Sequence, residues 1–367
     1  MRSRKHHSVT RRGKQPAAAL LTWYDAHRRE LPWRAKLGEA SDPYRVWLSE
    51  IMLQQTTVAA VGPYYRSFLK RWPDVKALAK APLDDVLGAW AGLGYYSRAR
   101  NLHLSAQMVA REHQGIFPHA SAELRKLPGI GAYTSAAIAA IAFGEAVAAL
   151  DANGERVIAR LFAVKEPLPK SRVQLGKLAQ QIVPRHRPGD FTQALMDLGS
   201  SICTPKKPDC LHCPLSKQCR AFALGVAEAL PRKAPKAERP LKRGAAFVAL
   251  DQRGAIYLEK RPEYGLLGAM LQPPLGAWTK SFPRPSAARQ QAPFRGAWKK
   301  LPGRVQHGFT HFELEMEIYL AEFKARPNGE GRWYTPEELP SAALPTVMRK
   351  VIAHALGNGH ISSARTR

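Results

Sequence analysis

All four cysteines of this chain lie within 17 residues, and this cluster restricts the possible folds more than any other feature of the sequence. They are Cys203, Cys210, Cys213 and Cys219, separated by six, two and five residues. Four thiolates in so short a loop can surround one metal centre, and by their chemistry alone a zinc ion and a [4Fe–4S] cluster are both possible. Zinc ribbons usually carry two Cys-x-x-Cys pairs, whereas this loop has one. No cysteine remains for a dispersed disulfide framework, which indicates a reducing compartment.

The chain is strongly basic, with 56 Lys and Arg against 29 Asp and Glu and a formal net charge of +27. Such a charge indicates a polyanionic partner, either nucleic acid or an anionic membrane surface, although a protein that is merely basic is the simpler alternative. Hydrophobic residues make up 45% and charged residues 23%, which excludes a largely disordered, collagen-like or coiled-coil chain. A length of 367 residues suggests about two or three domains.

Membrane and export signals are weak. The longest apolar stretch, residues 132–150, contains several polar residues and a glycine, and fits a buried helix better than a membrane span. Residues 1–14 are charged but no apolar segment follows them, so they do not form a signal peptide, although a transit peptide is possible in principle. We expect residues 1–17 to be a flexible basic arm and the protein to be cytoplasmic, bacterial in type and associated with the nucleoid.

Hydrophobic patterning divides the rest of the chain into two domains joined by a linker. Residues 18–224 show helical periodicity and no clear strand. The expected helices are 42–53, 81–92, 121–127, 134–143, 151–164 and 191–202. Residues 225–243 contain three Pro and six Lys or Arg, a composition typical of a linker or of an ordered basic loop. Residues 244–357 predict a small α+β domain, with strands at 245–250, 255–260 and 312–320 and a helix at 346–356, followed by a tail at 358–367. The strand at 312–320 alternates with period two and should be buried on one face.

A glycine-containing turn, residues 127–131 (LPGIG), separates two of the expected helices. Gly129 and Gly131 can expose backbone N–H groups at the start of the second helix, where the helix dipole favours a phosphate. An ordinary helix-to-helix turn is the alternative, and the positive charge of the chain favours DNA backbone.

Two carboxylates are candidates for acid–base chemistry. Glu50 lies in a nearly apolar helical run, so that burial would favour its neutral form and allow it to act as a general acid. Gln54 follows on the same helix face. Asp151 precedes a helix and is expected to cap it, which is compatible with a second role beside a developing cation. The simpler alternative for Glu50 is a paired acid of the core or surface.

These features together resemble the helix-hairpin-helix DNA glycosylases that carry an iron–sulfur cluster. The segments LPWR (31–34), VWLSEIMLQQT (46–56), GLGYYSRARNL (92–102) and LDAN (150–153) narrow the resemblance to adenine DNA glycosylases of the MutY type. The resemblance is strong over residues 18–222 and weaker over 244–356. It implies an all-α glycosylase domain with an iron–sulfur loop, followed by a small α+β Nudix-like domain.

The resemblance also assigns roles to individual residues. Glu50 would protonate adenine, and Asp151 would stabilise the sugar cation or add to it covalently, with Tyr133 and Asn153 positioning the pair. The four cysteines would hold one [4Fe–4S] cluster. Gln54 and Tyr95 would enter the base stack. The DNA-binding residues implied by the resemblance are Arg34, Gln54, Gln55, Tyr95, Gly129, Gly131, Phe309, Thr310 and His311.

Position 133 distinguishes between subfamilies. Bifunctional relatives such as endonuclease III carry a lysine just after the turn, and its amine forms a Schiff base that leads to strand cleavage. This chain has Tyr133 there, which predicts that the reaction stops at hydrolysis of the glycosidic bond. Endonuclease III-like proteins also lack the C-terminal extension.

The C-terminal domain lacks the acids of a working Nudix hydrolase. Residues 264–312 contain no Asp or Glu and seven Lys or Arg, which excludes a metal-dependent hydrolase site there and favours a surface that faces DNA. Phe309, Thr310 and His311 resemble the family's Phe-Ser-His loop, which recognises 8-oxoguanine. Thr310 keeps the hydroxyl but adds a methyl, and Pro273 departs from the aromatic-Pro pattern of the family.

The implied function is base-excision repair by a monomeric, monofunctional adenine DNA glycosylase that acts on duplex DNA with adenine opposite 8-oxoguanine or guanine. Three alternatives stay open. They are a pyrimidine-directed mismatch glycosylase of the same superfamily, a non-catalytic mismatch-binding protein, and a zinc-containing nucleic-acid adaptor. Retention of both Glu50 and Asp151 argues against a non-catalytic protein.

Overall fold

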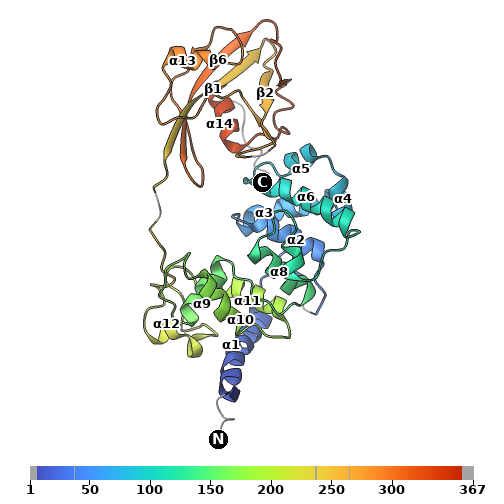
Figure 1. The fold of residues 1–367 in the computed structure, drawn as a ribbon, viewed down its shortest axis with the longest axis vertical. Helices are drawn as coiled ribbons and strands as arrows, with labels where there is room; N and C mark the ends of the chain where they lie inside the picture. The colour runs from blue at the N-terminus through green and yellow to red at the C-terminus, as the bar shows by residue number, and fades with distance from the viewer. Residues whose placement is uncertain (1–5, 37, 236–237, 264, 358–367) are drawn as a thin grey trace. The chain divides into compact units, whose positions relative to one another are not determined.

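The computed structural model describes residues 6–36, 38–235, 238–263 and 265–357 (Figure 1). The chain divides into two compact units, Met1–Lys80 with Asn101–Lys236, and Ala81–Arg100 with Ala237–Arg367. Residues 81–100, expected in the helical domain, therefore group with the C-terminal residues, and within this unit Lys260 Nζ lies 3.0 Å from Asp84 Oδ1. The predicted tail at 358–367 lies outside the described residues.

The first unit is built from helices. They are α1 (His6–His27), α2 (Pro43–Leu53), α3 (Val58–Arg71), α4 (Val75–Lys80), α6 (Ser97–Glu112, which begins in the other unit), α7 (Ser121–Leu124), α8 (Ala132–Phe143), α9 (Ala152–Leu161), α10 (Arg172–Gln180), α11 (Pro188–Ser201) and α12 (Arg220–Ala223). One core joins α1, α9, α10 and α11. Alanine-rich α8 packs against α2 and α11. At Gly189 an added Cβ would lie 2.7 Å from the Ala140 carbonyl oxygen, so only glycine permits this approach of α11 to α8.

The helices α2, α7, α8, α9 and α11 begin within three residues of their predicted starts, whereas α1, α3, α4, α6, α10 and α12 were not predicted individually. The Asp42 side chain accepts a hydrogen bond from Arg45 N and caps α2, and Pro43 occupies its first turn. Residues 6–17, expected as a flexible arm, form the first part of α1, because the alanine and leucine run after Pro16 continues a helix into the core. The predicted linker is ordered at both ends: Leu230 packs in a small core with Ala221 and Ala227, and β1 already begins at Leu241.

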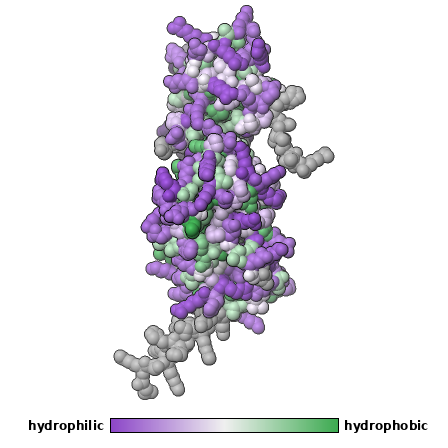
Figure 2. Space-filling model, turned by 90° about the vertical axis from the view of Figure 1, so that its right-hand side faces the viewer, coloured by the Kyte–Doolittle hydropathy of each residue, from purple (hydrophilic) through white to green (hydrophobic). Residues whose placement is uncertain are grey.

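The apolar stretch that includes α8 is a buried element of this unit, since Ala136–Ala140 have at most 5% exposure. Among the residues that the structure describes, no helix is long and apolar enough to cross a membrane. The face drawn in Figure 2 is mostly hydrophilic, with hydrophobic residues scattered between charged ones.

The second unit contains a seven-stranded mixed sheet. Its elements are α5 (Leu83–Ala89), β1 (Leu241–Asp251), β2 (Ile256–Lys260), β3 (Leu271–Gln272), α13 (Pro285–Gln290), β4 (Lys299–Lys300), β5 (Val305–Gly308), β6 (Glu313–Phe323), β7 (Arg332–Tyr334) and α14 (Thr346–Ala355). The order β3-β2-β1-β6-β4 places parallel β1 and β6 at the centre, while β5 pairs with β6 and β7 with β2.

Two hydrophobic cores lie on opposite faces of this sheet. One contains Met316 and Ile318 of β6 with residues of α14, and the other contains Tyr319 of β6 with Ala288 of α13. The prediction that β6 is buried on one face was therefore wrong. Glu317 fits this two-sided burial because Lys300 Nζ lies 2.6 Å from its Oε1. A central strand covered on both faces does not need strict alternation.

Candidate active site and cysteine loop

Glu50 lies on α2 with only 7% of its surface exposed. Burial raises the pKa of Glu50 to about 7, and the negative charge of Asp151 acts in the same direction. The Tyr133 hydroxyl donates a hydrogen bond to the Glu50 carboxylate and lowers this pKa, as does the charge of Arg34. The structure therefore brings Glu50 and Tyr133 of α8 together, close to Asp151, as the sequence predicts. A carboxyl group in this environment exchanges a proton near neutral pH.

Asp151 caps α9, as its position in the sequence predicts. Its Oδ1 accepts a hydrogen bond from Gly154 N at 2.7 Å, and its Oδ2 accepts one from Asn153 Nδ2 at 2.9 Å. Both carboxylate oxygens are therefore oriented by neighbours on the same helix. A carboxylate held rigidly beside a buried acid can stabilise a positive charge that develops between them.

Arg156 extends this arrangement, and the sequence analysis did not identify it. Its Nη2 donates to Asn153 Oδ1 at 2.8 Å and to Gly199 O at 2.6 Å, and its Nε donates to Cys203 O at 2.7 Å. A continuous chain of hydrogen bonds thus runs from Asp151 to the cysteine loop. The available signal was the pair Arg156 and Arg160, four residues apart in an otherwise apolar part of α9, which places both on one buried face.

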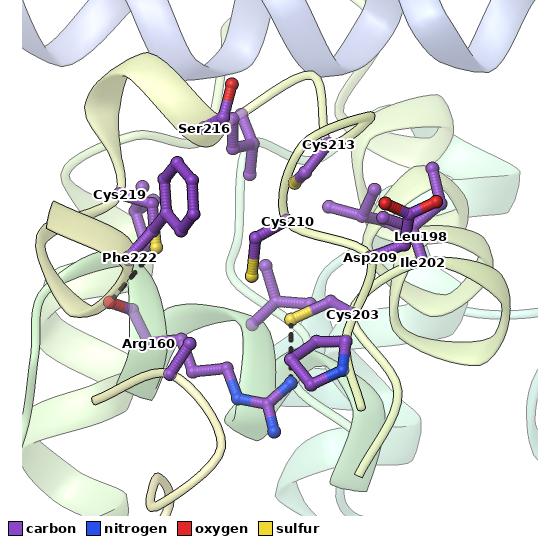
Figure 3. Close-up of a pocket in the computed structure, with 15 residues that line it drawn as sticks. Arg160, Leu198, Ile202, Cys203, Asp209, Cys210, Cys213, Ser216, Cys219 and Phe222 are labelled. Atoms are coloured by element: carbon purple, nitrogen blue, oxygen red, sulfur yellow. Dashed lines mark hydrogen bonds between the residues drawn. The ribbon is translucent and has the colours of Figure 1, made fainter. Parts of the chain in front are cut away.

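The cysteine loop surrounds a cavity, and all four cysteines line it (Figure 3). Burial raises the pKa of the Cys213 thiol to about 12 and shifts Cys210 and Cys219 in the same direction. Arg160, 2% exposed, donates from Nη1 to Cys203 Sγ at 3.3 Å and to Thr204 O at 2.7 Å. The Arg160 guanidinium carries a single positive charge beside four cysteines. Thiols bind a metal as thiolates, so a bound metal centre would supply the further positive charge that favours this form.

The spacing of the thiols bears on what they can hold. Four sulfurs around one zinc ion, each about 2.3 Å from it, lie about 3.8 Å from one another. Within the described parts of the chain, no three His, Cys, Asp or Glu side chains form a group that could hold a single metal ion. The four cysteines nevertheless line one common space. Four thiolates around one space are the donor set of a zinc ion or of a [4Fe–4S] cluster.

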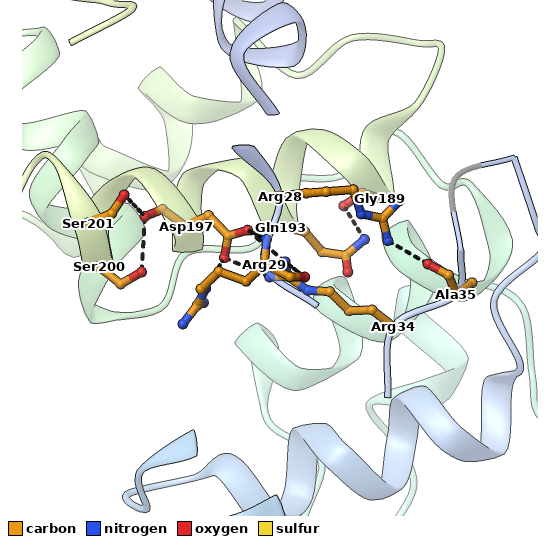
Figure 4. A network of polar contacts seen from close by, with 9 residues as sticks. All are labelled: Arg28, Arg29, Arg34, Ala35, Gly189, Gln193, Asp197, Ser200 and Ser201. Atoms are coloured by element: carbon orange, nitrogen blue, oxygen red, sulfur yellow. Dashed lines mark hydrogen bonds and ion pairs between the residues drawn. The ribbon is translucent and has the colours of Figure 1, made fainter. Parts of the chain in front are cut away.

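Asp197 of α11 is fully buried and organises the segment before α2 (Figure 4). Arg34 donates from Nη1 and Nη2 to its two carboxylate oxygens at 2.6 and 2.8 Å, and Arg29 N donates to Oδ2 at 3.1 Å. Burial raises the pKa of Asp197, but the hydrogen bonds and charges of Arg34 and Arg29 outweigh burial, and the net pKa is below its usual value. The DNA contact predicted for Arg34 stays a prediction, because its guanidinium has this internal partner.

The predicted helix-hairpin-helix turn joins α7 to α8. Gly129 has a φ of +75°, and an added Cβ would lie 2.7 Å from the Asn101 Cβ, so glycine is required there. Gly131 is the N-cap of α8 and faces open space. Gln54 Nε2 donates to Thr134 Oγ1 at 3.1 Å, which ties the end of α2 to the start of α8. Gln55 follows with a φ of 58°, a conformation that costs a non-glycine residue energy and often marks a functional site.

Four further residues predicted to contact DNA lie in the second unit, at two places in the chain. Tyr95 is 47% exposed and has a φ of 48°, and the Arg98 guanidinium lies 5.5 Å from its ring centroid. Thr310 and His311 are exposed at the tip of the turn between β5 and β6, while Phe309 is half-buried. The structure is consistent with exposed recognition residues at these places, and their contacts with DNA stay predictions.

The two parts of the chain match two known domain families. Residues 48–185 match the HhH-GPD superfamily of base excision DNA repair proteins, and residues 245–354 match the NUDIX domain. The predicted fold, a helix-hairpin-helix domain followed by a Nudix-like domain, is confirmed. Among solved structures, a thermostable thymine-DNA glycosylase is similar with a TM-score of 0.53 and 33% identity, over 58% of this chain and 98% of that one.

The particular family follows from relatives that match most of the chain. A human adenine DNA glycosylase is 36% identical over 91% of this chain and 72% of its own length. The adenine DNA glycosylase of Buchnera aphidicola subsp. Baizongia pistaciae is 34% identical over 91% of this chain and 94% of its own. The chain belongs to the adenine DNA glycosylase family, as the sequence motifs predict.

Replacing Asp197 by Asn should destabilise the protein by about 3 kcal/mol, because two arginines lose a buried charge partner. Asp190→Asn, on the same helix but in a more exposed ion pair with Arg187, should cost less than about 1 kcal/mol. Urea unfolding measures both. The pKa of Asp197 is depressed in the folded state, so its contribution should be complete above about pH 4 and decline as the pH falls through the folded-state pKa. Equal effects of the two substitutions would contradict this account.

Proposed function

We propose that the protein hydrolyses the N-glycosidic bond of adenine mispaired with 8-oxoguanine or guanine in duplex DNA and leaves an abasic site. The observation that carries the proposal is the pairing of a buried Glu50, with a pKa of about 7, with a capping Asp151 in an adenine DNA glycosylase family member. Two carboxyl groups with divided protonation states are the general requirement for cleaving a glycosidic bond.

The proposed reaction begins with the adenine flipped out of the duplex, because its reactive atoms are inaccessible in the stack. Glu50, protonated at rest, donates its proton to N7 of adenine, and the C1′–N9 bond breaks. The Asp151 carboxylate, held by Gly154 and Asn153, stabilises the oxocarbenium-like sugar or adds to it covalently. Water then adds to C1′ and gives its proton to the Glu50 carboxylate, which restores the acid and completes hydrolysis.

The reaction is proposed to stop at the abasic site. Strand cleavage by a bifunctional glycosylase requires an amine nucleophile for a Schiff base. Position 133 offers a phenol instead, and its hydroxyl donates a hydrogen bond to Glu50. Burial raises the pKa of Tyr133 well above its usual value, so this hydroxyl keeps its proton and remains a donor.

Single-turnover assays on three duplexes test the substrate and the chemistry together. We expect adenine to be released fastest opposite 8-oxoguanine and more slowly opposite G. The DNA strand that carried the adenine should stay intact until alkali is added. A duplex with T opposite G should release no base. Strand cleavage without alkali would contradict the monofunctional reaction.

The second candidate is a pyrimidine-directed mismatch glycosylase, which the similarity to the thymine-DNA glycosylase structure favours. Base release from the T–G duplex and none from the adenine duplexes would select it. Tight duplex binding without any base release would instead select a non-catalytic mismatch-binding protein.

The raised pKa of Glu50 predicts how the chemical step depends on pH. The acid is active in its protonated form, so the single-turnover rate should fall as the pH rises through about 7 and decline about tenfold per unit well above it. Glu50→Gln should lower the rate by at least about 100-fold. The matched control is Glu39→Gln, which makes the same change at an exposed acid before α2. Gln54 is not used for a control because it is a predicted DNA contact. A flat profile, or a Glu50→Gln protein with a near-normal rate, would exclude this role.

We further propose that the four cysteines hold one [4Fe–4S] cluster, which would supply iron–thiolate bonds that fold the loop and no chemistry at the sugar. The common cavity that all four cysteines line supports one shared inorganic group, and the single Cys-x-x-Cys pair and the family membership favour a cluster over zinc. Lys206, Lys207 and Lys217 are in the same loop, which is proposed to contact the DNA backbone.

Purified protein should be brown, with broad visible absorbance and about four irons per chain, whereas a zinc protein would be colourless. Removal of the iron should weaken binding to duplex DNA, measured by fluorescence anisotropy, because the basic loop loses its order. Wild-type affinity should also fall steeply with salt. A colourless protein with stoichiometric zinc would overturn the assignment.

The partner is proposed to be double-stranded DNA and the working form a monomer. The proposed location is cytoplasmic, as expected from the similarity to bacterial relatives over nearly their whole length, with association to the nucleoid proposed because the substrate is DNA.

A further inference from the structure

Arg239 lies directly before β1, in the segment that leads from the first unit into the sheet, and it contacts the turn between β5 and β6. Its Nη1 donates to the Phe309 carbonyl oxygen at 3.0 Å. Its Nη2 lies 2.7 Å from Glu313 Oε1, at the first residue of β6. One guanidinium therefore joins both sides of the turn. No role follows for Arg239 from the sequence motifs or from the proposed chemistry.

The turn itself is tightly specified. Phe309 N donates to Phe312 O at 2.8 Å, and the two rings stack with centroids 4.6 Å apart. Lys242 Nζ lies 4.6 Å from the Phe312 ring centroid. Thr310 and His311 form the exposed tip between the two phenylalanines. The side chains available to a ligand are thus the two that the rest of the turn does not use.

Holding the Phe309 carbonyl fixes more than one atom. The peptide bond is planar, so the carbonyl of Phe309 and the N–H of Thr310 belong to one rigid unit. An arginine that fixes this carbonyl therefore also fixes the direction in which the chain enters Thr310. A second bond from the same region, Glu313 N to Pro240 O at 3.0 Å, fixes the other side of the turn. The orientation of the tip consequently depends on residues 239–240.

We propose that Arg239 is a positioning residue for recognition of the base opposite adenine: it sets the orientation of the Thr310–His311 tip and thereby the preference for 8-oxoguanine over guanine. The inference rests on the proposed function. Arg239 differs from a phosphate contact, because its charge is already paired with Glu313. Its loss should alter discrimination between duplexes more than general affinity for DNA.

The experiment compares single-turnover rates on duplexes with adenine opposite 8-oxoguanine and opposite guanine. For Arg239→Gln the ratio of the two rates should fall about three- to ten-fold, since a misplaced contact of this kind weakens orientation without removing the binding groups. Arg239→Lys, which keeps the charge but loses the two-pronged geometry, should recover only part of the ratio. Arg232→Gln is the matched control, because it removes the same charge from another exposed position of the same segment.

Two further measurements separate positioning from other roles. Glu313→Gln should lower the ratio as well, and the double variant should be no worse than the more severe single variant, because the two residues act through one contact. The slope of log affinity against log salt should be the same for Arg239→Gln and wild type, whereas loss of a phosphate contact would reduce the slope by about 1.

The outcomes distinguish this inference from the proposed function. If wild-type protein shows no preference for 8-oxoguanine, the proposed recognition fails and the inference fails with it. A second outcome is that the wild-type protein prefers 8-oxoguanine and His311→Ala weakens this preference. If the rate ratio of Arg239→Gln then equals that of the Arg232→Gln control, only the inference about Arg239 is overturned. A reduced salt slope with an unchanged ratio would likewise overturn it and make Arg239 a phosphate ligand.

Discussion

Two buried arginines on α9 hold this helix against α11 and the cysteine loop, and the geometry of the first unit depends on that attachment. Arg156 reaches Gly199 and Cys203 through backbone oxygens, and Arg160 reaches Cys203 and Thr204. The N-terminus of the same helix carries Asp151. A single rigid element therefore joins the candidate catalytic carboxylate to the loop that surrounds the proposed cluster, so a displacement of the loop must be transmitted to the carboxylate.

Two buried acids of the first unit have pKa values shifted in opposite directions. Asp197 is fully buried but accepts hydrogen bonds from Arg29 and Arg34, so it stays ionised and stabilises the fold. Glu50 is almost as buried and receives a neutral phenol, so it retains a proton near neutral pH. The difference lies in the partners and not in burial alone. Charge pairing stabilises a buried ion, whereas a hydrogen bond to a neutral group offsets only part of the desolvation cost.

Sequence reasoning predicted the features that depend on local rules. The caps Asp42 and Asp151, the helices of the hairpin and the strands β1, β2 and β6 follow from short-range hydrogen bonding and periodicity, whereas the short strands β3, β4, β5 and β7 were not predicted. The pairing of Arg34 with Asp197 was not predicted, because 163 residues separate the two partners. β6 was misjudged for a related reason. Its alternating glutamates indicate a solvent-facing side, but a second core covers that side of the sheet.

The sequence by itself determined the composition of the sites: four thiols in one loop, two acids at fixed places on helices, a phenol where relatives carry an amine, and an acid-free basic stretch near the C-terminus. Only the tertiary structure decided how these groups behave. Burial of Glu50 beside Tyr133 set its pKa, and long-range contacts oriented the cysteines and the 309–312 turn. The pKa and orientation of a side chain depend on neighbours brought together by packing, which local sequence rules do not encode.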